Sequence, residues 1–308
     1  MDTGWLEDFQ VLAECANFSR AAERRAMTQP NLSRRIKSLE DWVGAPLFDR
    51  SSHQLVLTEA GKSFRPVADE VLRRLQLGQR EAREAGKAAL STLRIASTHV
   101  LSQLFFPGWM QSLEARGTVG TVRLMADHTQ ACERLMLAGE AQFLLCHHHP
   151  AATSSLDSKQ FRSVTLGADV LLPVSAPDAS GAARYRLPGA EGRPIPFLAY
   201  SHESGMGRIL AAHLALHEPS AWLESVFVSH LATVLATRAR DGRGMTWSPR
   251  SLIAGDLETG ALVRAGGEAW DVPIEIQLIR PRGRQSAAAE AFWSLLERPA
   301  PPERPSDA

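Results

Sequence analysis

Hydrophobic residues recur every three or four positions through much of the first ninety residues, which is the spacing of amphipathic helices. The pattern predicts a first helix over residues 5–16, followed by two short helices joined by a tight turn. Ser19 can cap the first helix of this pair and Thr28 the second, because a hydroxyl at that position accepts a free backbone amide. Pro30 then fits the first helical turn. This arrangement is typical of a helix-turn-helix motif.

The second helix of the pair has an apolar and a polar face. Leu32, Ile36 and Leu39 fall at i, i+4 and i+7 and therefore share one buried side. Gly44 ends the helix. The short apolar run at 55–57 predicts a strand, and we expect this strand to form a wing that contacts the DNA backbone. Arg and Lys contact guanine or phosphate, while Gln and Asn read adenine. The residues expected to bind DNA are Ser19, Gln29, Pro30, Asn31, Ser33, Arg34, Lys37, Arg50 and His53.

Positive charge is concentrated in this motif. The chain has 34 Lys and Arg against 34 Asp and Glu, so its formal net charge is zero. Residues 20–37 contain six Arg or Lys and one acid, Glu23, which gives a local balance of 6 − 1 = +5. A charge run usually marks a solvated surface. Here capping, core spacing and charge all indicate a DNA-binding motif, so attraction to nucleic acid comes from this patch and not from net charge.

A long amphipathic helix is predicted after Thr58, which can cap it. Apolar residues from Phe64 to Leu75 recur at steps of three and four, and the helix is expected to run to about Lys87. One small domain cannot cover a stripe of that length. The helix is therefore expected to pair with its copy in a second chain, and residues 86–89 are expected to form a hinge to the next region.

From residue 91 the pattern changes to short apolar runs that alternate with helical stretches. It predicts an α/β region with mainly parallel sheets, whose ligands bind beyond the carboxyl ends of the strands. The Pro-rich end from residue 299 is expected to be a disordered tail. The expected strands are 92–96, 119–125, 142–146, 170–174, 195–199, 224–228, 244–247 and 274–279.

Length and composition indicate a protein of two or three modules. A chain of 308 residues can bury more than one core. No run reaches the length of a membrane span and the N-terminus lacks a signal-peptide pattern, so a cytoplasmic location with no membrane partner is expected. The chain has an odd number of cysteines, Cys15, Cys132 and Cys146, which favours reduced thiols over a disulfide framework.

Two strand ends carry polar groups with the chemistry of a binding site. Ser97, Thr98 and His99 stand where a strand gives way to a helix, so hydroxyls and free amides there can hold an anion; plain helix capping explains the same residues. His147 and His148 follow the apolar run 143–145. Adjacent residues of an extended chain alternate faces, so at most two groups of this segment can meet at one ion. We assign no metal there and expect these histidines to line a cleft.

Tyr200 and Ser201 open a helix after another strand. Gly205 and Gly207 flank Met206, which predicts an accessible thioether at a helix start and not a core methionine. The cleft wall opposite Thr98 is expected to be completed by Ser229, His230, Thr246 and Trp247.

Three blocks of the N-terminal sequence resemble the LysR-type transcriptional regulators. They are Phe18-Ser19-x-Ala21-Ala22, Thr28-Gln29-Pro30-x-x-Ser33-Arg34-x-Ile36-x-x-Leu39-Glu40 and Gly44-x-x-Leu47-Phe48-x-Arg50. The resemblance implies an all-α winged helix-turn-helix over 1–58 and a dimerising linker helix with its hinge over 59–90. It also implies a two-lobed α/β effector domain, like the periplasmic binding proteins, over 91–298. The second lobe is expected at roughly 168–268, before the tail at 299–308.

Further motifs resemble the hypochlorite-responsive branch of that family. They are Trp5-Leu6-x-Asp8-Phe9, the glycine-flanked Met206, Phe227-Val228-Ser229, Asp241-Gly242-x-Gly244-Met245-x-Trp247-x-Pro249 and Ala291-Phe292-Trp293. Methionine oxidation is the activating chemistry of that branch, so the resemblance implies a redox role for Met206. Sulfoxide formation is reversible and makes the side chain polar, which suits a switch. The alternative is that Met206 packs between the lobes while the cleft senses a small anionic metabolite.

No catalytic constellation, glycine-rich phosphate loop or cofactor motif is evident in the sequence. We therefore predict a homodimeric or homotetrameric LysR-type regulator that binds double-stranded DNA, uses no cofactor and responds to a small-molecule or oxidant signal. The alternative from another class is a two-lobed solute-binding or enzymatic domain fused to a DNA anchor.

Overall fold

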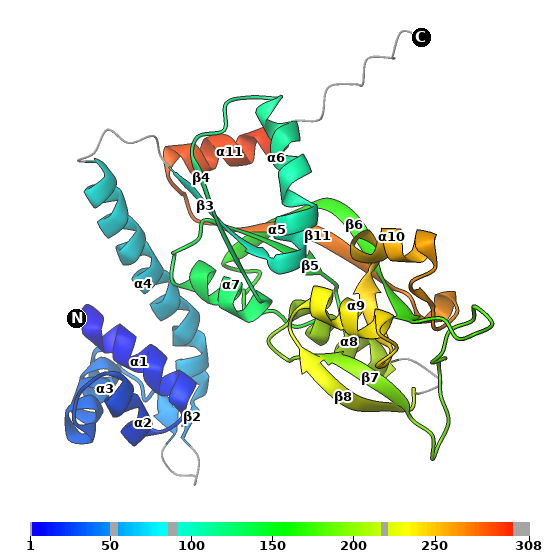
Figure 1. Cartoon of the computed structure of the whole chain (residues 1–308). Helices are drawn as coiled ribbons and strands as arrows, with labels where there is room; N and C mark the ends of the chain where they lie inside the picture. Colours follow the sequence, from blue (N-terminus) through cyan, green and yellow to red (C-terminus); the bar gives the residue numbers. More distant parts are fainter. Residues whose placement is uncertain (1, 50–54, 86–91, 217–220, 298–308) are drawn as a thin grey trace. The chain divides into compact units, whose positions relative to one another are not determined.

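The computed structural model describes residues 2–49, 55–85, 92–216 and 221–297 (Figure 1). The chain divides into two compact units, one within the first 88 residues and one that comprises most of the remainder. Arg50 and His53, the expected hinge and the expected tail lie outside the described residues.

The first unit is a winged helix-turn-helix, which confirms the predicted class. Its elements are α1 (Thr3–Cys15), α2 (Phe18–Arg24), α3 (Gln29–Val43) and the antiparallel wing strands β1 (Phe48–Asp49) and β2 (Val56–Leu57). Leu32, Ile36 and Leu39 are fully buried, as their spacing predicts, in a core shared with Phe9 and Leu12. Because α3 buries this face, its polar side chains remain available on the opposite one.

The helix caps differ in part from the prediction. Asn17, and not Ser19, is the N-cap of α2, since its side chain accepts the amide of Arg20 at 3.0 Å. Thr28 does occupy the N-cap position of α3, but its hydroxyl makes no capping hydrogen bond. Gly44 ends α3 at φ 81°, a left-handed conformation that glycine adopts without steric cost.

The long helix α4 (Glu59–Ala85) follows the wing, and Thr58 Oγ1 caps it by accepting the amide of Gly61 at 3.0 Å. Its apolar stripe divides in two. Leu72 is buried in the core of the first unit, whereas Val67 and Leu75 are 54% and 49% exposed. The expectation that Leu72 belongs to an open seam is therefore wrong, because this side chain already has partners within its own unit.

The second unit is an α/β fold with two hydrophobic cores, one built around Ile95, Phe143 and Phe292 and the other around Leu198 and Trp247. Its strands are β3 (Leu93–Thr98), β4 (Val122–Asp127), β5 (Phe143–His148), β6 (Phe161–Ser175), β7 (Ile195–Tyr200), β8 (Leu223–Ser229), β9 (Thr246–Pro249), β10 (Val263–Arg264) and β11 (Val272–Pro281). Its α-helices are α5 (His99–Leu104), α6 (Phe106–Glu114), α7 (Thr129–Leu137), α8 (Gly205–Leu216), α9 (Ala232–Arg240), α10 (Arg250–Thr259) and α11 (Ala287–Glu297). The two-lobed α/β class is confirmed.

The sheets are not mainly parallel, which corrects the prediction. The main sheet has the order β10-β6-β11-β5-β3-β4 with β9 beside β6, and β7 and β8 form a second sheet. Among the described strands, β3 is parallel to β4 and β5, and β7 is parallel to β8. Strands β6 and β11 pair antiparallel along the whole of β11. These two long strands run in opposite directions through the main sheet. They also connect the two lobes (Figure 1).

Candidate functional site

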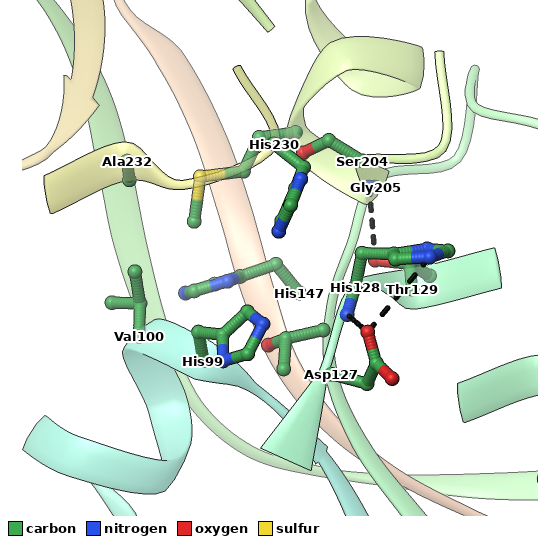
Figure 2. Close-up of a pocket in the computed structure, with 12 residues that line it drawn as sticks. His99, Val100, Asp127, His128, Thr129, His147, Ser204, Gly205, His230 and Ala232 are labelled. Atoms are coloured by element: carbon green, nitrogen blue, oxygen red, sulfur yellow. Dashed lines mark hydrogen bonds and ion pairs between the residues drawn. The ribbon is translucent and has the colours of Figure 1, made fainter. Parts of the chain in front are cut away.

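A small pocket lies where the carboxyl ends of β3, β4 and β5 meet the start of α8 (Figure 2). These three strands are parallel neighbours, so the residues that follow them gather at one edge of the sheet. The interior space measures about 30 Å³, which suits one small ion or one or two water molecules. The lining residues are Thr98, His99, Val100, Asp127, His128, Thr129, His147, Ser204, Gly205, Met206, His230 and Ala232.

Four of the lining residues are histidines. The ring centroid of His230 lies 5.8 Å from that of His99 and 5.6 Å from that of His128. Burial is the main cause of the lowered pKa of His99; Asp127 opposes the shift, and His230 adds to it. Burial lowers the pKa of His147 to about 4. Both imidazoles are therefore mainly uncharged near neutral pH.

Two buried polar atoms at this pocket have no hydrogen-bond partner within the described part of the chain. They are the hydroxyl Oγ1 of Thr98 and Nε2 of His147. A buried polar atom without a partner costs free energy, so such atoms are uncommon in folded proteins. Both atoms lie beside the cavity, where a water molecule or a bound group can complete their hydrogen bonding.

Met206 borders the pocket but is only 7% exposed, and it belongs to the apolar core around Leu235. The expectation of an accessible thioether is wrong. The flanking glycines have a different cause, which is close packing: a Cβ on Gly205 would lie 2.5 Å from Thr129 Oγ1, and one on Gly207 would overlap the carbonyl oxygen of Ser201. Apart from the apolar core, the side chain of Met206 borders only the small pocket.

The first turn of α8 is tied to α7. The amide of Gly205 donates to Thr129 Oγ1 at 2.9 Å, and the guanidinium of Arg208 binds the carboxylate of Glu133. Met206 lies between these two anchoring points in the sequence. These contacts hold the helical turn that carries Met206 against α7.

Several predicted effector residues lie in the protein core instead. Ser97 is buried and donates to the carbonyl of Thr98 at 3.2 Å, while Tyr200 donates to the carbonyl of Trp247 at 2.9 Å. Burial raises the pKa of Tyr200. Thr246 donates to the carbonyl of Leu198 and Trp247 to that of Trp270, both at 2.9 Å. Their polar atoms therefore serve the fold.

Three other predicted residues also lie away from the pocket lining. His148 lines a neighbouring cavity of about 50 Å³. The hydroxyl of Ser229 accepts the amide of Leu231 at 3.1 Å, and the carbonyl of Ser201 accepts the amide of Ser204 at 3.1 Å, so both shape turns before helices. The predicted residues that do line the pocket are Thr98, His99, His147, Met206 and His230.

The sequence reasoning missed Asp127, His128 and Thr129, which lie at and after the end of β4. The same signal that singled out Thr98 was available, since polar residues follow an apolar run at the carboxyl end of a predicted parallel strand. Applying that rule to every expected strand would have found them.

Metal and thiol chemistry receive no support from the geometry. Within the described ranges, no group of three or more His, Cys, Asp or Glu side chains is arranged to hold a metal ion. Cys132 and Cys146 are buried, and burial raises the pKa of each thiol to about 12. Both therefore remain protonated at physiological pH, and a protonated thiol is a poor nucleophile.

The predicted DNA-binding residues lie mainly at the surface of the first unit. Gln29, Pro30, Asn31, Arg34 and Lys37 are exposed on α3, Ser19 is exposed on α2, and Ser33 is half-buried. Pro30, Asn31, Arg34 and Lys37 lie on the side of α3 away from its buried residues, and Gln29 lies at the exposed start of the helix.

The positive patch is smaller than the residue count suggests. The carboxylate of Asp8, which is fully buried, pairs with Nε of Arg25 at 2.7 Å and with Nε of Arg35 at 2.5 Å. This network joins α1, α2 and α3. Arg20 and Arg34 form no ion pair within the described residues, so they carry the unneutralised charge of the motif.

Among the described residues, no helix is both long enough and apolar enough to cross a membrane.

Comparison with known proteins covers both units. Residues 3–62 match the family of bacterial regulatory helix-turn-helix proteins of the lysR type, and residues 86–300 match the LysR substrate binding domain. The HTH-type transcriptional regulator YjiE of Escherichia coli K12 is 31% identical over 296 residues, which is 96% of this chain and 94% of that protein.

Two solved structures are similar over nearly the full length. Full-length HypT from Salmonella typhimurium, described as a hypochlorite-specific LysR-type transcriptional regulator, is 31% identical with a TM-score of 0.56 over 96% of this chain and 97% of its own. Vibrio fischeri DarR, solved in complex with DNA, is 30% identical with a TM-score of 0.54 over 97% and 99%. The chain therefore belongs to the LysR family of DNA-binding transcriptional regulators and is not an enzyme.

Proposed function

We propose that this LysR-type regulator responds to hypochlorite through oxidation of Met206. The observation that carries the proposal is the position of this thioether, at a pocket of about 30 Å³ that also contains the unpartnered Thr98 hydroxyl and His147 Nε2. A pocket of that size admits an oxidant as small as hypochlorous acid and is too small for most metabolites. The likeness to HypT, described as hypochlorite-specific, supports the same signal.

The chemistry of this step balances without a cofactor. Hypochlorous acid transfers its oxygen to the thioether sulfur, which loses two electrons, and chlorine leaves as chloride. The net reaction is R–S–CH₃ + HOCl → R–S(O)–CH₃ + H⁺ + Cl⁻. The product is a polar sulfoxide in place of a buried apolar thioether.

A new sulfoxide oxygen at Met206 needs a hydrogen-bond donor. The Thr98 hydroxyl borders the same cavity and has no partner within the described residues, so it can provide one. Met206 lies in the first turn of α8, which is tied to α7 through Gly205 and Arg208, so we expect the new hydrogen bond to act on this connection. A free-energy difference of about 5 kcal/mol moves a two-state equilibrium from mostly off to mostly on. Several new hydrogen bonds of this kind across an oligomer together supply that free energy.

The test compares wild type with Met206→Ile, which cannot be oxidised there, and with Met125→Ile as a matched control. Met125 is more exposed than Met206 and does not line the pocket. After treatment with about one equivalent of hypochlorite, peptide mass spectrometry should find sulfoxide at Met206, and operator binding should change several-fold in wild type and in Met125→Ile only. An unmodified Met206 at doses that alter operator binding, or a normal response of Met206→Ile, contradicts the proposal. The pocket should then be tested with small anionic metabolites.

A further inference from the structure

The cations of the DNA-binding unit differ in how firmly each is paired. Lys37 and Asp41 form a pair at 3.1 Å in which the side chains are 66% and 63% exposed. An exposed pair of this kind contributes little free energy, so a DNA phosphate can replace the carboxylate at small cost. Arg25 and Arg35 instead share the carboxylate of Asp8, which is fully buried. These two cations are therefore held much more firmly.

The guanidinium of Arg35 lies in a site that α1 provides. Its Nε is 2.5 Å from Oδ2 of Asp8, and its Nη2 is 3.9 Å from Oδ2 of Asp2. Gly4 leaves room for this group, because a Cβ at that position would overlap Nη2 of Arg35. Only 29% of the Arg35 side chain is exposed. A cation of the recognition helix α3 is thus bound to a neighbouring helix (Figure 1).

Arg35 would otherwise be placed to reach DNA. It follows Asn31 by four residues on α3, so the two side chains lie on the same side of the helix. Asn31 is exposed, and so is Arg34, the direct neighbour of Arg35. A free guanidinium at this position could bind a phosphate, and phosphate contacts carry no sequence information of their own.

We propose that Asp8 is a positioning residue that keeps Arg35 away from DNA phosphate and so limits sequence-independent binding. A buried carboxylate depends on its cations, so moving Arg35 to a phosphate would remove one of the two that compensate Asp8. Arg35 therefore stays on α1 when DNA binds, and base contacts decide a larger share of the affinity. This restraint lies within the DNA-binding unit and does not depend on the signal that the effector domain senses.

Replacing Asp8 by Asn should release Arg35 and retain Arg25. An amide side chain has one acceptor oxygen, and its NH₂ group cannot pair with a guanidinium. Arg25 can keep that oxygen, and it also donates to Oε2 of Glu7 at 2.6 Å. Among the described residues, Arg35 keeps only the carboxylate of Asp2, at 3.9 Å. One additional cation then becomes available to phosphate.

The experiment measures binding of the full-length protein to a random-sequence duplex by fluorescence anisotropy, from about 0.05 to 0.3 M sodium chloride. The slope of log affinity against log salt concentration reports the phosphates neutralised, at about 0.9 for each. Asp8→Asn should steepen this slope by about 0.9 and should bind the random duplex several-fold more tightly at the lowest salt concentration. A purely structural role would not increase the slope. An unchanged slope in an Asp8→Asn protein that circular dichroism shows to be folded would overturn the inference.

Two further variants identify the cation that is released. Arg35→Gln alone should leave the wild-type slope unchanged, since Arg35 makes no phosphate contact while Asp8 holds it. The double variant with Asp8→Asn and Arg35→Gln should also return to the wild-type slope. A lower slope for Arg35→Gln alone, which can be measured even if Asp8→Asn does not fold, contradicts the inference. A double variant that keeps the steeper slope contradicts it as well.

Glu23→Gln is the matched control for the loss of one negative charge. Glu23 is exposed on α2 and forms no ion pair within the described residues, so its replacement releases no arginine. This variant should keep the wild-type slope. If Glu23→Gln steepens the slope as much as Asp8→Asn does, net charge explains the effect and Asp8 has no positioning role.

Discussion

Arg208 and Glu133 form a paired hydrogen bond between α8 and α7, at 3.1 and 3.2 Å. The side chain of Glu133 is 3% exposed and that of Arg208 is 20% exposed. Arg208 also donates to the carbonyl of Thr153, and Glu133 accepts the hydroxyl of Ser154 at 2.9 Å. This contact anchors the helical turn that carries Met206, so the geometry of the pocket depends on it.

Replacing Arg208 by Met should destabilise the protein by about 3 kcal/mol, because it leaves the Glu133 carboxylate buried without its cation. Chemical denaturation followed by circular dichroism gives the free energy of unfolding. The double variant Glu133→Gln with Arg208→Met removes the stranded charge and should recover much of that loss. A single variant within about 0.5 kcal/mol of wild type would show that the pair is not a structural anchor.

His147 should make the protein less stable in mild acid. Its pKa is lowered from 6.5 to about 4 by burial, so the unfolded chain binds this proton below about pH 6.5 while the folded chain does not until about pH 4. Stability is therefore complete above pH 6.5 and falls as the pH drops, by about 2 kcal/mol between pH 7 and pH 5. Denaturation of His147→Leu should show a flatter pH profile than wild type. The exposed His202→Leu should keep the wild-type profile, and equal slopes in all three proteins would refute the assignment.

Arg34 and Arg35 are neighbours in sequence with different expected roles. Arg34 is exposed and forms no ion pair within the described residues, so Arg34→Ala should weaken operator binding by about 1–3 kcal/mol. The same variant should weaken binding to random DNA by less and should not lower the stability of the protein. Arg35→Ala should instead lower the melting temperature, because Arg35 pairs with the buried Asp8. Fluorescence anisotropy with operator and scrambled duplexes measures the DNA affinity of each variant, and thermal melts measure its stability. Together they distinguish the roles of Arg34 and Arg35. Equal losses for Arg34→Ala on both duplexes would mean that Arg34 contacts only phosphate.

The exposed part of the α4 stripe should carry dimerisation. Leu75→Asp places a charge in an apolar contact, so light scattering should report a lower mass while the protein stays folded. Leu72→Asp should unfold the first unit, since Leu72 is buried in its core. Lys62→Asp, at an exposed position of the same helix, controls for charge alone. A Leu75→Asp protein with wild-type mass would place the interface elsewhere.

The sequence by itself determined the DNA-binding fold, because its signals are local. The burial of Leu32, Ile36 and Leu39 follows from helical spacing, and the end of α3 follows from the left-handed conformation that Gly44 adopts. Each feature depends on residues within one or two turns of each other. The same local reasoning found Thr98, since a polar residue after an apolar strand is visible in the sequence.

Tertiary structure decided which charges and side chains remain available. Arg25 and Arg35 add to the positive charge of residues 20–37 in the sequence, but both pair with Asp8 of α1, which is buried only after the three helices pack. Likewise, the glycines beside Met206 suggest exposure, whereas they allow close approach to Thr129 and Ser201. Contacts between distant segments leave no local signature, so spacing alone cannot reveal them.

The pocket shows most clearly which features tertiary structure decided and the sequence did not. Its histidines lie at positions 99, 128, 147 and 230, in four separate segments, and no local pattern shows that the four come together. They meet because β3, β4 and β5 are parallel and end at one edge, while the antiparallel pair β6 and β11 connects this edge to the lobe that contributes His230. Strand pairing over such separations is set by the packing of the whole sheet and not by any one stretch of sequence.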